Sequence, residues 1–463
     1  MTDTILTISP IDGSVFVERH YADMKIIEDS LALAQKAQKE WKKVPLDERK
    51  TRCTKAVDAF VGKKDEIARE ISWQMGRPIR SAASEVRGLE ERARTMIRLA
   101  DKALLPLRPA KKERFQRWIE REPLGLVFVI APWNYPYLTA INAIMPALLA
   151  GNTVVLKHSA QTPLCAERLH EAFTVAGMPE GVFSFLHLNH ADTERVIRDD
   201  RVNFVAFTGS VPGGRMVQAA AAGRFINVGL ELGGKDPAYV RQDADLKHAV
   251  DTVMDGAFYN SGQSCCGIER IYVHEGVYDE FLEKAINWVN GLVLGRSDEV
   301  QTTLGPMVRT SAADFVREQI REAIAQGAVP HISAGDFPLD GEGTPYLAPQ
   351  LLTGVDHTMR IMTEESFGPV AGIQKVRSDE EAVQLMNDSE FGLTAAIFTA
   401  DIERGIELGR MVETGTFFVN RCDYLDPELA WTGIKHSGRG CTLSLIGFEA
   451  LTRPKSYHIK THV

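Results

Sequence analysis

From residue 124 onwards, short apolar runs alternate with segments of helical period, and this alternation limits the folds that the chain can adopt. The first series of apolar runs spans residues 127–131, 153–157, 182–186, 203–208 and 226–231, with helical segments between them, for example at 164–176 and 213–222. Strands that are separated by helices pair in parallel, and the helices then cover both faces of the sheet. The sequence therefore predicts an α/β protein built on a doubly wound parallel sheet.

The same alternation starts again after Gly234 and predicts a second α/β domain. Its strands are expected at residues 238–240, 270–273, 370–376, 395–399 and 417–420, and its helices at 246–257 and 278–292. The first hundred residues have helical spacing instead, with helices expected at 24–41, at 47–75 with a break near Gly62, and at 82–104. Residues 111–122 read as a strand without a clear buried face, as in a projecting hairpin or an intersubunit strand, and residues 455–463 as an edge strand.

The composition is that of a soluble globular protein and argues against several functional classes. The 463 residues carry 53 Lys and Arg against 62 Asp and Glu, a net charge of -9. Such a chain lacks the basic surface that broad binding to nucleic acids or anionic membranes requires. Residues 123–156 hold no charged side chain, but Pro132, Pro136 and Pro146 interrupt any single membrane-spanning helix there. We expect a buried strand, a turn, a helix and a second strand in this window.

Six cysteines are too few for a disulfide scaffold, and none has a metal-binding spacing such as Cys-x-x-Cys. We therefore expect no metal site. Residues 1–10 include Asp3 and show neither a basic segment nor a long apolar run, so we expect no signal peptide and predict the reducing cytosol as the compartment.

Cys265 is the first candidate for chemistry, because it ends a glycine-bearing loop shortly before a predicted strand. The segment reads FYNSGQSCCG over residues 258–267. Loops at the ends of parallel strands often form active sites, and an activated cysteine there is a candidate nucleophile. The alternative is that Cys265 and Cys266 are small buried apolar residues, which we expect of Cys266. A disulfide between adjacent cysteines needs a strained peptide, so we expect none.

Two polar residues beside predicted strands are further candidates. Glu231 ends an apolar strand before two glycines; burial would raise its pKa, as a general base needs, whereas the alternative is a salt bridge to Lys235. Asn134 stands in a proline-flanked turn, PWNYP, where its side-chain N–H could donate to a developing oxyanion or close an Asx-turn. The residues alone leave both pairs of alternatives open.

Glycine-rich and charged positions at other strand ends suit a phosphate-bearing ligand. The segment FTGSVPGG at 207–214 ends a strand and opens a helix, so its N–H groups could face a phosphate, although it is not a G-x-G-x-x-G motif. Lys157 ends another strand and could reach a cofactor hydroxyl or phosphate, or be a solvated cation. Glu365, two residues before Phe367, could bind ribose hydroxyls or be a surface charge.

In their order and spacing, these stretches resemble the aldehyde dehydrogenase superfamily across essentially the whole chain. The matching stretches are PWNYP at 132–136, LKHSAQTP at 156–163, FTGSVPGG at 207–214, LELGGKDP at 230–237, FYNSGQSC ending at Cys265, EESFGPV at 364–370 and GIKHSGRG at 433–440. The resemblance implies two doubly wound α/β domains and a small β oligomerisation element, assembled as a homodimer or homotetramer. The implied ranges are 1–108 and 124–233 for a dinucleotide-binding domain, 234–447 for a catalytic domain, and 109–123 and 448–463 for the oligomerisation element.

The resemblance also implies roles for single residues. Cys265 would attack an aldehyde carbonyl to give a thiohemiacetal, and Asn134 with the backbone N–H of Cys265 would hold the oxyanion. Transfer of hydride to NAD or NADP would leave a thioester, which water activated by Glu231 would hydrolyse to the carboxylic acid. Relatives that pass the acyl group to coenzyme A typically lack this glutamate, so its presence favours hydrolysis. The positions that match cofactor-binding residues are Trp133, Lys157, Ala160, Gly209, Ser210, Gly214, Leu232, Glu365 and Phe367.

Two departures from the family pattern bear on function. Many NAD-preferring members have Lys-Pro-x-Glu where this chain runs from Lys157 to Ala160. The missing carboxylate at Ala160 removes repulsion against a 2′-phosphate, so we expect NADP to be tolerated. Gly440-Cys441 stands where relatives often read Gly-Arg-Glu-Leu, a glutamate with auxiliary proton-relay roles in some members, and residues 430–433 replace the usual Pro-Phe-Gly-Gly.

Two rival functions can be weighed from the sequence. A non-catalytic structural relative would have no need of Cys265, Glu231 and Asn134 together. A cofactor-independent cysteine hydrolase would need a histidine base, for which only His158 and His436 are candidates.

The substrate is indicated only by candidate pocket residues. Candidates for an apolar lining are Tyr137, Ile141, Tyr424 and Leu425. Arg421 could bind the carboxylate of a semialdehyde such as succinate semialdehyde, or lie on a surface loop. Asp423 and Asp426 could neutralise this arginine or instead favour a cationic aldehyde.

Overall fold

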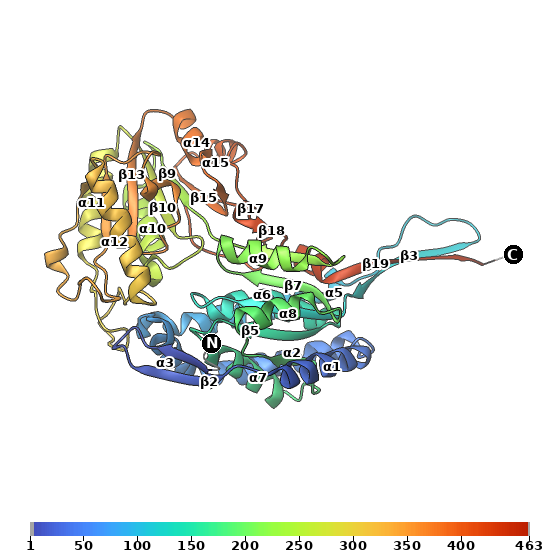
Figure 1. Ribbon diagram of the computed structural model, residues 1–463. Coiled ribbons are helices and arrows are strands. Elements are labelled where there is room, and N and C mark those ends of the chain that lie inside the picture. The colour runs from blue at the N-terminus through green and yellow to red at the C-terminus, as the bar shows by residue number, and fades with distance from the viewer. Residues whose placement is uncertain (1–3, 462–463) are drawn as a thin grey trace.

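The computed structural model describes residues 4–461 and contains two parallel sheets, each with helices on both faces (Figure 1). The first sheet consists of β18 (Gly438–Arg439), β8 (Asn227–Glu231), β7 (Val202–Thr208), β4 (Leu126–Ala131), β5 (Thr153–His158) and β6 (Phe183–Phe185), in that spatial order. Strands β4 to β8 run parallel, and β18 pairs antiparallel with β8 at the edge.

Alternate side chains of β4 explain why helices cover both faces of the first sheet. Val127 and Val129 pack in one buried cluster and Phe128 and Ile130 in another, because successive strand residues point to opposite faces. The first cluster includes residues of α2 (Leu46–Val61), α3 (Lys64–Met75), α4 (Ile79–Ala82), α5 (Ser84–Ala103), α6 (Pro136–Ala150) and α7 (Pro163–Val175). The second includes residues of α1 (Met24–Trp41), α8 (His190–Arg198) and α9 (Val211–Ala221). The predicted doubly wound sheet is confirmed.

The second sheet is built in the same way, which confirms the second predicted α/β unit. Its spatial order is β11 (Val329–Pro330), β12 (Gln350–Thr353), β13 (Val370–Val376), β10 (Ile268–His274), β9 (Asp236–Val240), β15 (Thr394–Phe398) and β16 (Thr416–Val419). From β12 to β16 all neighbouring strands are parallel. One face is covered by α10 (Leu246–Phe258) and α11 (Tyr278–Asn290), and the other by α12 (Thr310–Ala325), α13 (Arg360–Thr363), α14 (Asp379–Asn387) and α15 (Ile402–Gly409).

A two-stranded antiparallel ribbon extends away from both sheets, at the right of Figure 1. It pairs β3 (Phe115–Pro123) with β19 (Thr452–Lys460) over nine residues of each strand. The rings of Trp118 and Tyr457 stack across it at 4.5 Å. Both strands were expected from the sequence; residues 462–463, the end of the predicted C-terminal strand, and residues 1–3 lie outside the described residues.

The prediction of helices throughout the first hundred residues is wrong at the start of the described chain. There β1 (Thr4–Ile8) and β2 (Val15–His20) form an antiparallel hairpin. Residues of β1 alternate between buried and exposed, and Ile5 and Val17 are 4% exposed. The alternation with a period of two residues, followed by a turn at Gly13, is typical of a β-hairpin and argues against the predicted helix.

The uncharged window folds as β4, α6 and β5, as expected. Among residues 4–461, none of the helices is both long and apolar enough to cross a membrane. The break expected near Gly62 is also present, since α2 ends at Val61 and α3 begins at Lys64. The predicted domain boundaries stay a prediction; β18 joins the first sheet although its residues fall within the range predicted for the catalytic domain.

The remaining short elements lie in loops between these larger ones. They are the bridge pair β14 (Phe391–Gly392) with β17 (Ile434–Lys435) and the 3₁₀ turns η1 (Tyr259–Gly262), η2 (Ala334–Asp336) and η3 (Ile446–Leu451). Of these, η1 leads directly into the loop that carries Cys265.

Candidate active site

Several of the predicted site residues converge where the two sheets meet. Asn134 follows the carboxyl end of β4, Gly209 and Ser210 follow that of β7, and Glu231 ends β8. Because these strands are parallel, all four residues share one edge of the first sheet. Cys265 precedes β10 and therefore lies at the amino edge of the second sheet. One cavity is lined by residues from both edges, including all five of these.

The loop before Cys265 has a strained and closely packed backbone. Asn260 and Ser261 have φ angles of 53° and 57°, in the left-handed region. Gly262 has φ of 70°, and a Cβ there would lie 2.1 Å from a main-chain carbonyl oxygen, so only glycine fits. The Nε of Arg77 donates to Oδ1 of Asn260 at 3.1 Å. The loop is thus held from outside, and the Cys265 side chain remains partly accessible.

Asn134 is buried against this loop. Its Nδ2 donates to the carbonyl oxygen of Gln263 at 3.2 Å, which leaves a second N–H available. The Asn134 carbonyl accepts from Nη2 of Arg77 at 2.6 Å, and Arg77 forms a buried ion pair with Glu85 at 2.9 Å. The side chain is therefore directed to the Cys265 loop rather than to an Asx-turn. No sequence motif marked Arg77 and Glu85, which hold this turn in place.

Glu231 ends β8 in a partly buried position, and two threonine hydroxyls donate to its carboxylate. Thr442 Oγ1 lies 2.5 Å from Oε1, and Thr208 Oγ1 lies 3.0 Å from Oε2. Burial raises the pKa of Glu231 above its ordinary value, and the two hydroxyls oppose that rise. The alternative of a salt bridge to Lys235 is wrong, since Lys235 Nζ pairs with Glu269 at 2.5 Å.

Three cavities meet at Glu231 and Thr208, and we name each after a residue in its wall. The Trp133 cavity has a volume of about 460 Å³, the Arg92 cavity about 360 Å³ and the Thr442 cavity about 300 Å³. Glu231 and Thr208 line all three, and Cys265 lines the Trp133 and Arg92 cavities. Cys265 and Glu231 can therefore be approached from different sides.

The Trp133 cavity combines aromatic rings with a buried carboxyl group. Trp133 and Phe367 meet edge to face at 5.6 Å, and Leu232 forms part of the same wall. Burial raises the pKa of Glu365 to about 8, and the neighbouring Glu269 adds to that rise. Glu365 Oε1 accepts from the backbone N–H of Gly234 at 3.0 Å. A carboxyl group with capacity for further hydrogen bonds in an apolar cavity fits the ribose hydroxyls of a nicotinamide cofactor.

The helix α9 begins at the same cavity. Its N-cap is Ser210, whose Oγ accepts from the backbone N–H of Gly213 at 3.3 Å. The positive end of this 11-residue helix suits the pyrophosphate of a dinucleotide. Gly214 lies within α9, where a Cβ would come 2.7 Å from the Leu232 side chain. It supports close packing and does not line the Trp133 cavity.

Two further predicted cofactor residues lie outside the wall of the Trp133 cavity. The side-chain amine of Lys157, in β5, makes no hydrogen bond or ion pair with the residues that the structure describes, and burial lowers its pKa to about 8. The carbonyl of Ala160 accepts from Thr7 Oγ1 of the N-terminal hairpin at 2.9 Å. An amine whose side chain has no partner among the described residues is available to bind an anionic ligand.

The Arg92 cavity tests the predicted substrate lining. Tyr424 and Leu425 line it, as expected. The prediction for Tyr137 and Ile141 is wrong, because both side chains are buried in the core, at 0% and 2% exposure. The next residue after each of them in α6, Leu138 and Asn142, lines the cavity instead, together with Thr139.

Arg421, which was expected to bind a substrate carboxylate, does not line the Arg92 cavity. Arg421 is exposed and stacks on the Tyr424 ring at 3.6 Å, and it does not form part of the wall. Arg92 of α5 takes that place: it is 7% exposed, and its Nη1 donates to Leu138 O at 2.8 Å and Asn142 Oδ1 at 3.2 Å. Among the described residues Arg92 has no carboxylate partner. It occupies an ordinary position in a helix, so no sequence pattern marked it.

Acidic side chains also reach this wall. Asp423 accepts from Ser264 Oγ and from Cys266 Sγ, both at 3.0 Å, and burial raises its pKa to about 7. Burial also raises the pKa of Asp255. Asp426 is exposed and outside the wall. Cys266 is 3% exposed, which confirms it as a buried thiol, and both it and Cys265 are unpaired.

Neither candidate histidine lies in a cavity wall with Cys265. Burial lowers the pKa of His158 to about 4, and its Nε2 lies 3.0 Å from the carbonyl of Pro136. His436 is half-buried, and its Nδ1 lies 3.4 Å from Glu390 Oε2. The cysteine-hydrolase alternative therefore lacks the histidine base that it needs.

Comparison with known proteins identifies the chain's relatives. The model of the aldehyde dehydrogenase family matches residues 1–457. The chain is 34% identical over 446 residues to a succinate semialdehyde dehydrogenase [NAD(P)+] of Escherichia coli K12, covering 96% of this chain and 95% of that protein. It is 32% identical over 462 residues to a succinate-semialdehyde dehydrogenase [NADP(+)] of Mycobacterium avium, covering 99% and 94%.

A solved structure gives the same result for the fold. The crystal structure of succinic semialdehyde dehydrogenase from Streptococcus pyogenes, in complex with NADP+, superposes with a TM-score of 0.94 at 30% identity. The match covers 98% of this chain and all of that chain.

Proposed function

Since the chain belongs to the aldehyde dehydrogenase family and oxidises an aldehyde with NAD or NADP, we propose that Cys265, Asn134 and Glu231 are its catalytic residues. The observation that supports this most directly is that all three line one cavity between the two sheets. A nucleophile, an oxyanion donor and a base must reach the same carbonyl group, so their convergence is what this reaction requires.

In the first half of the reaction Cys265 acts as the nucleophile. Its thiolate forms a bond to the carbonyl carbon, and the carbonyl oxygen becomes the oxyanion of a thiohemiacetal. The second N–H of Asn134 Nδ2 and the backbone N–H of Cys265 donate to that oxygen. Because Arg77 and Gln263 already hold Asn134, this donor needs no rearrangement when the substrate arrives.

The Trp133 cavity would hold the cofactor. The chemistry that NAD or NADP supplies when bound is the acceptance of a hydride. Glu365 would accept hydrogen bonds from the ribose hydroxyls, and the first turn of α9 would face the pyrophosphate. Phe367 and Trp133 would enclose the nicotinamide ring. Lys157 would reach the adenosine half.

In the second half of the reaction Glu231 acts as the base. It takes a proton from water while the water oxygen bonds to the thioester carbon and the bond to Cys265 Sγ breaks. The products are the carboxylic acid and the cysteine thiolate. A carboxylate with a raised pKa is a better proton acceptor near neutral pH than an ordinary one.

For the substrate we propose an aldehyde with a carboxylate at its far end, of the succinate semialdehyde type. The relatives from Escherichia coli and Mycobacterium avium carry that name. In this chain the supporting residue is Arg92, a permanently charged side chain in the wall that also contains Cys265. Burying a charge without an opposite partner costs free energy. A substrate carboxylate would pair with the Arg92 guanidinium and offset that cost. Arg87 lies exposed in the same wall.

A cationic aldehyde is the alternative that the acidic residues of this wall favour. Asp423 already accepts from two side chains, and with a pKa of about 7 it is protonated in a large fraction of molecules at neutral pH. It is therefore a weaker partner for a cation than Arg92 is for an anion. The comparison favours the carboxylate-bearing substrate.

The substrate test compares succinate semialdehyde, uncharged butanal and 4-aminobutanal by the absorbance of the reduced cofactor. We expect kcat/KM for succinate semialdehyde to exceed that for butanal by about 10–100-fold, the value of a hydrogen bond to a charged group. Arg92→Met should remove this preference and leave butanal oxidation little changed. The matched control is Arg98→Met, on the same helix but paired with Glu428 at the surface. A preference for 4-aminobutanal would assign the cationic substrate instead.

We also propose that NADP is used about as well as NAD. Ala160 offers no carboxylate to repel a 2′-phosphate, and Lys157 is without an acidic partner among the described residues. The ratio of the two kcat/KM values should lie within about tenfold, and Ala160→Glu should shift it toward NAD because like charges repel. A hundredfold preference of the unaltered enzyme for NAD would contradict the proposal.

For the assembly we propose a homodimer or homotetramer joined through the β3–β19 ribbon. Leu107 pairs with Ile119 on the outer side of β3, whereas the outer side of β19 has no strand partner among the described residues and suits pairing with another chain. Light scattering should give a multiple of 51.3 kDa; a monomer would contradict this. We propose the cytosol as the compartment, because Cys265 must stay reduced to react and all six cysteines are free thiols.

A further inference from the structure

Thr442 makes the shorter of the two hydroxyl contacts to Glu231, from a segment 211 residues further along the chain. We propose that Thr442 is a positioning residue that holds the Glu231 carboxylate in place for hydrolysis of the thioester. The inference rests on the role proposed above for Glu231. Thr442 itself does not bond to the reacting atoms; it acts through the base.

The backbone around Thr442 places its hydroxyl with little freedom. Strand β18 pairs Gly438 with Glu231 itself, so the segment is attached to the same strand as the base. The N–H and carbonyl of Thr442 both bond to Trp431, each at 2.9 Å. The next residue, Leu443, has φ of 60°, a left-handed conformation that persists only where the surroundings enforce it.

The hydrogen bond from Thr442 affects the charge state of Glu231. The Glu231 carboxylate has no ion pair with the described residues, although a general base must be ionised to accept a proton. Burial favours its neutral form, and the strongest opposing contribution to the pKa of Glu231 is the hydrogen bond from Thr442, followed by that from Thr208. A hydroxyl that donates to the carboxylate stabilises the ionised form. Thr442 therefore keeps the base both charged and oriented.

The hydrolysis step can be isolated without the cofactor. A nitrophenyl acetate acylates Cys265 and releases nitrophenolate, which reports the acylation rate. After removal of excess ester, intact-protein mass spectrometry follows loss of the acetyl group, which reports hydrolysis alone. Acylation involves Cys265 and Asn134, whereas hydrolysis requires Glu231.

Three variants separate a positioning role from a general loss of structure. Thr442→Val should leave acylation unchanged and slow hydrolysis by about 10–100-fold, the value of a hydrogen bond to a charged group. Thr442→Ser keeps the hydroxyl and should restore the rate. The matched control is Thr432→Val, because Thr432 Oγ1 donates to Gly440 O at 2.6 Å in the same segment but does not touch Glu231.

The pH dependence gives a readout that a purely structural role would not move. Without the Thr442 hydroxyl the pKa of Glu231 rises further, so the acid limb of the hydrolysis rate should shift to higher pH in Thr442→Val and return in Thr442→Ser. An unshifted limb, equal slowing of both steps, or the same effect in Thr432→Val would overturn the inference. Glu231→Gln is measured in parallel: if it does not slow hydrolysis, the proposed function fails; if it does and Thr442→Val does not, only this inference fails.

Discussion

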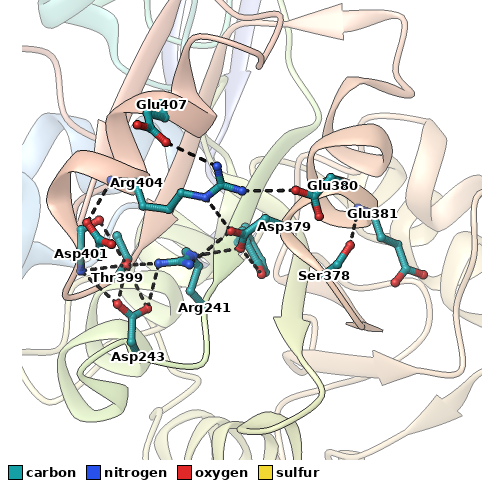
Figure 2. Close-up of polar contacts among 11 residues, drawn as sticks. Arg241, Asp243, Ser378, Asp379, Glu380, Glu381, Thr399, Asp401, Arg404 and Glu407 are labelled. Carbon is teal, nitrogen blue, oxygen red and sulfur yellow. Dashed lines mark hydrogen bonds and ion pairs between the residues drawn. The ribbon is translucent and has the colours of Figure 1, made fainter.

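The carboxyl edge of the seven-stranded sheet differs from the region where its amino edge faces the first sheet in how the charged groups are paired. At the carboxyl edge, Figure 2 shows a network of carboxylates that accept hydrogen bonds from Arg241 and Arg404. Asp379 at the start of α14 accepts from Tyr239 Oη at 3.0 Å and from the Nε atoms of Arg241 and Arg404, each at 2.9 Å. Arg241 follows β9 and Arg404 lies on α15, so the network joins a strand end to two helices.

Where the amino edge, with Cys265, faces the first sheet, Lys235 pairs with Glu269, but three other charged groups have no opposite partner within residues 4–461. Among the described residues, the Glu231 carboxylate has hydroxyl donors but no cation, the Arg92 side chain has no carboxylate and the Lys157 amine has no partner. A compensated network stabilises the fold, whereas uncompensated groups beside cavities cost stability and persist where a ligand uses them. The comparison separates charges that hold the molecule together from charges that act on a substrate.

The largest effect should come from the nucleophile at the amino edge. Cys265→Ala should lower kcat/KM by about 10⁴-fold or more, because Cys266, the adjacent thiol, does not line the cavity that holds Asn134. Its melting temperature should stay close to that of the unaltered enzyme. The adjacent Cys266→Ala is the control and should retain most of the activity. Equal loss in both variants would indicate that the loop, rather than the Cys265 thiol, is being tested.

Removing the base should have the next largest effect. Glu231→Gln should slow hydrolysis of the acyl-enzyme by about 10²–10⁴-fold, the usual contribution of a general base. In the unaltered enzyme the rate should fall as the pH drops through the pKa of Glu231, which burial places above 4.5, and this acid limb should be absent from the variant. Glu364→Gln, which alters a surface carboxylate paired with Arg360 at 2.7 Å, should leave the pH profile unchanged.

The same contrast explains which parts of the molecule could be predicted from the sequence. Strands such as β4 and β7 are short apolar runs bounded by turns, so their local pattern is sufficient. Whether Glu231 forms a salt bridge depends on residues that the fold brings near it, not on its neighbours in the sequence. Between Glu231 and Lys235 the chain leaves the first sheet and enters the second, so the two side chains meet different neighbours.

Residues recruited from distant segments were beyond the reach of local patterns. Arg92 meets Asn142 across 50 residues, and Thr442 meets Glu231 across 211. The only advance signal was the departure from the family pattern at Gly440-Cys441, directly before Thr442. The wrong choice of Tyr137 and Ile141 has a smaller cause: one residue along a helix turns a side chain by about 100°, which moves the cavity-facing position to Leu138 and Asn142.

A moderate effect is expected at Lys157. Lys157→Met should weaken NADP binding by about 10–100-fold and NAD binding less, if the amine meets the 2′-phosphate. The pKa of about 8 adds a pH dependence: as the pH rises above that value the free enzyme loses this charge, so its preference for NADP should fall. Dissociation constants for both cofactors between pH 6 and pH 9 would check this. A preference that is constant with pH would contradict it.

The smallest effect on catalysis should come from the compensated network. Asp379→Asn should lower the free energy of unfolding by about 2–3 kcal/mol, because three donors lose a charged acceptor, and leave kcat/KM unchanged.

Burial alone would raise the pKa of Asp379, but the hydrogen bonds from Arg241 and Arg404 outweigh it and hold the pKa below 3.8. The stabilisation is therefore complete above that pH and is lost as the pH falls through the folded-state pKa. The difference in melting temperature between the two proteins should be constant above about pH 5 and shrink below about pH 4. Glu407→Gln, at an exposed 3.4 Å contact to Arg404, should change it little. If Asp379→Asn altered kcat/KM as Glu231→Gln does, the distinction between the two edges would fail.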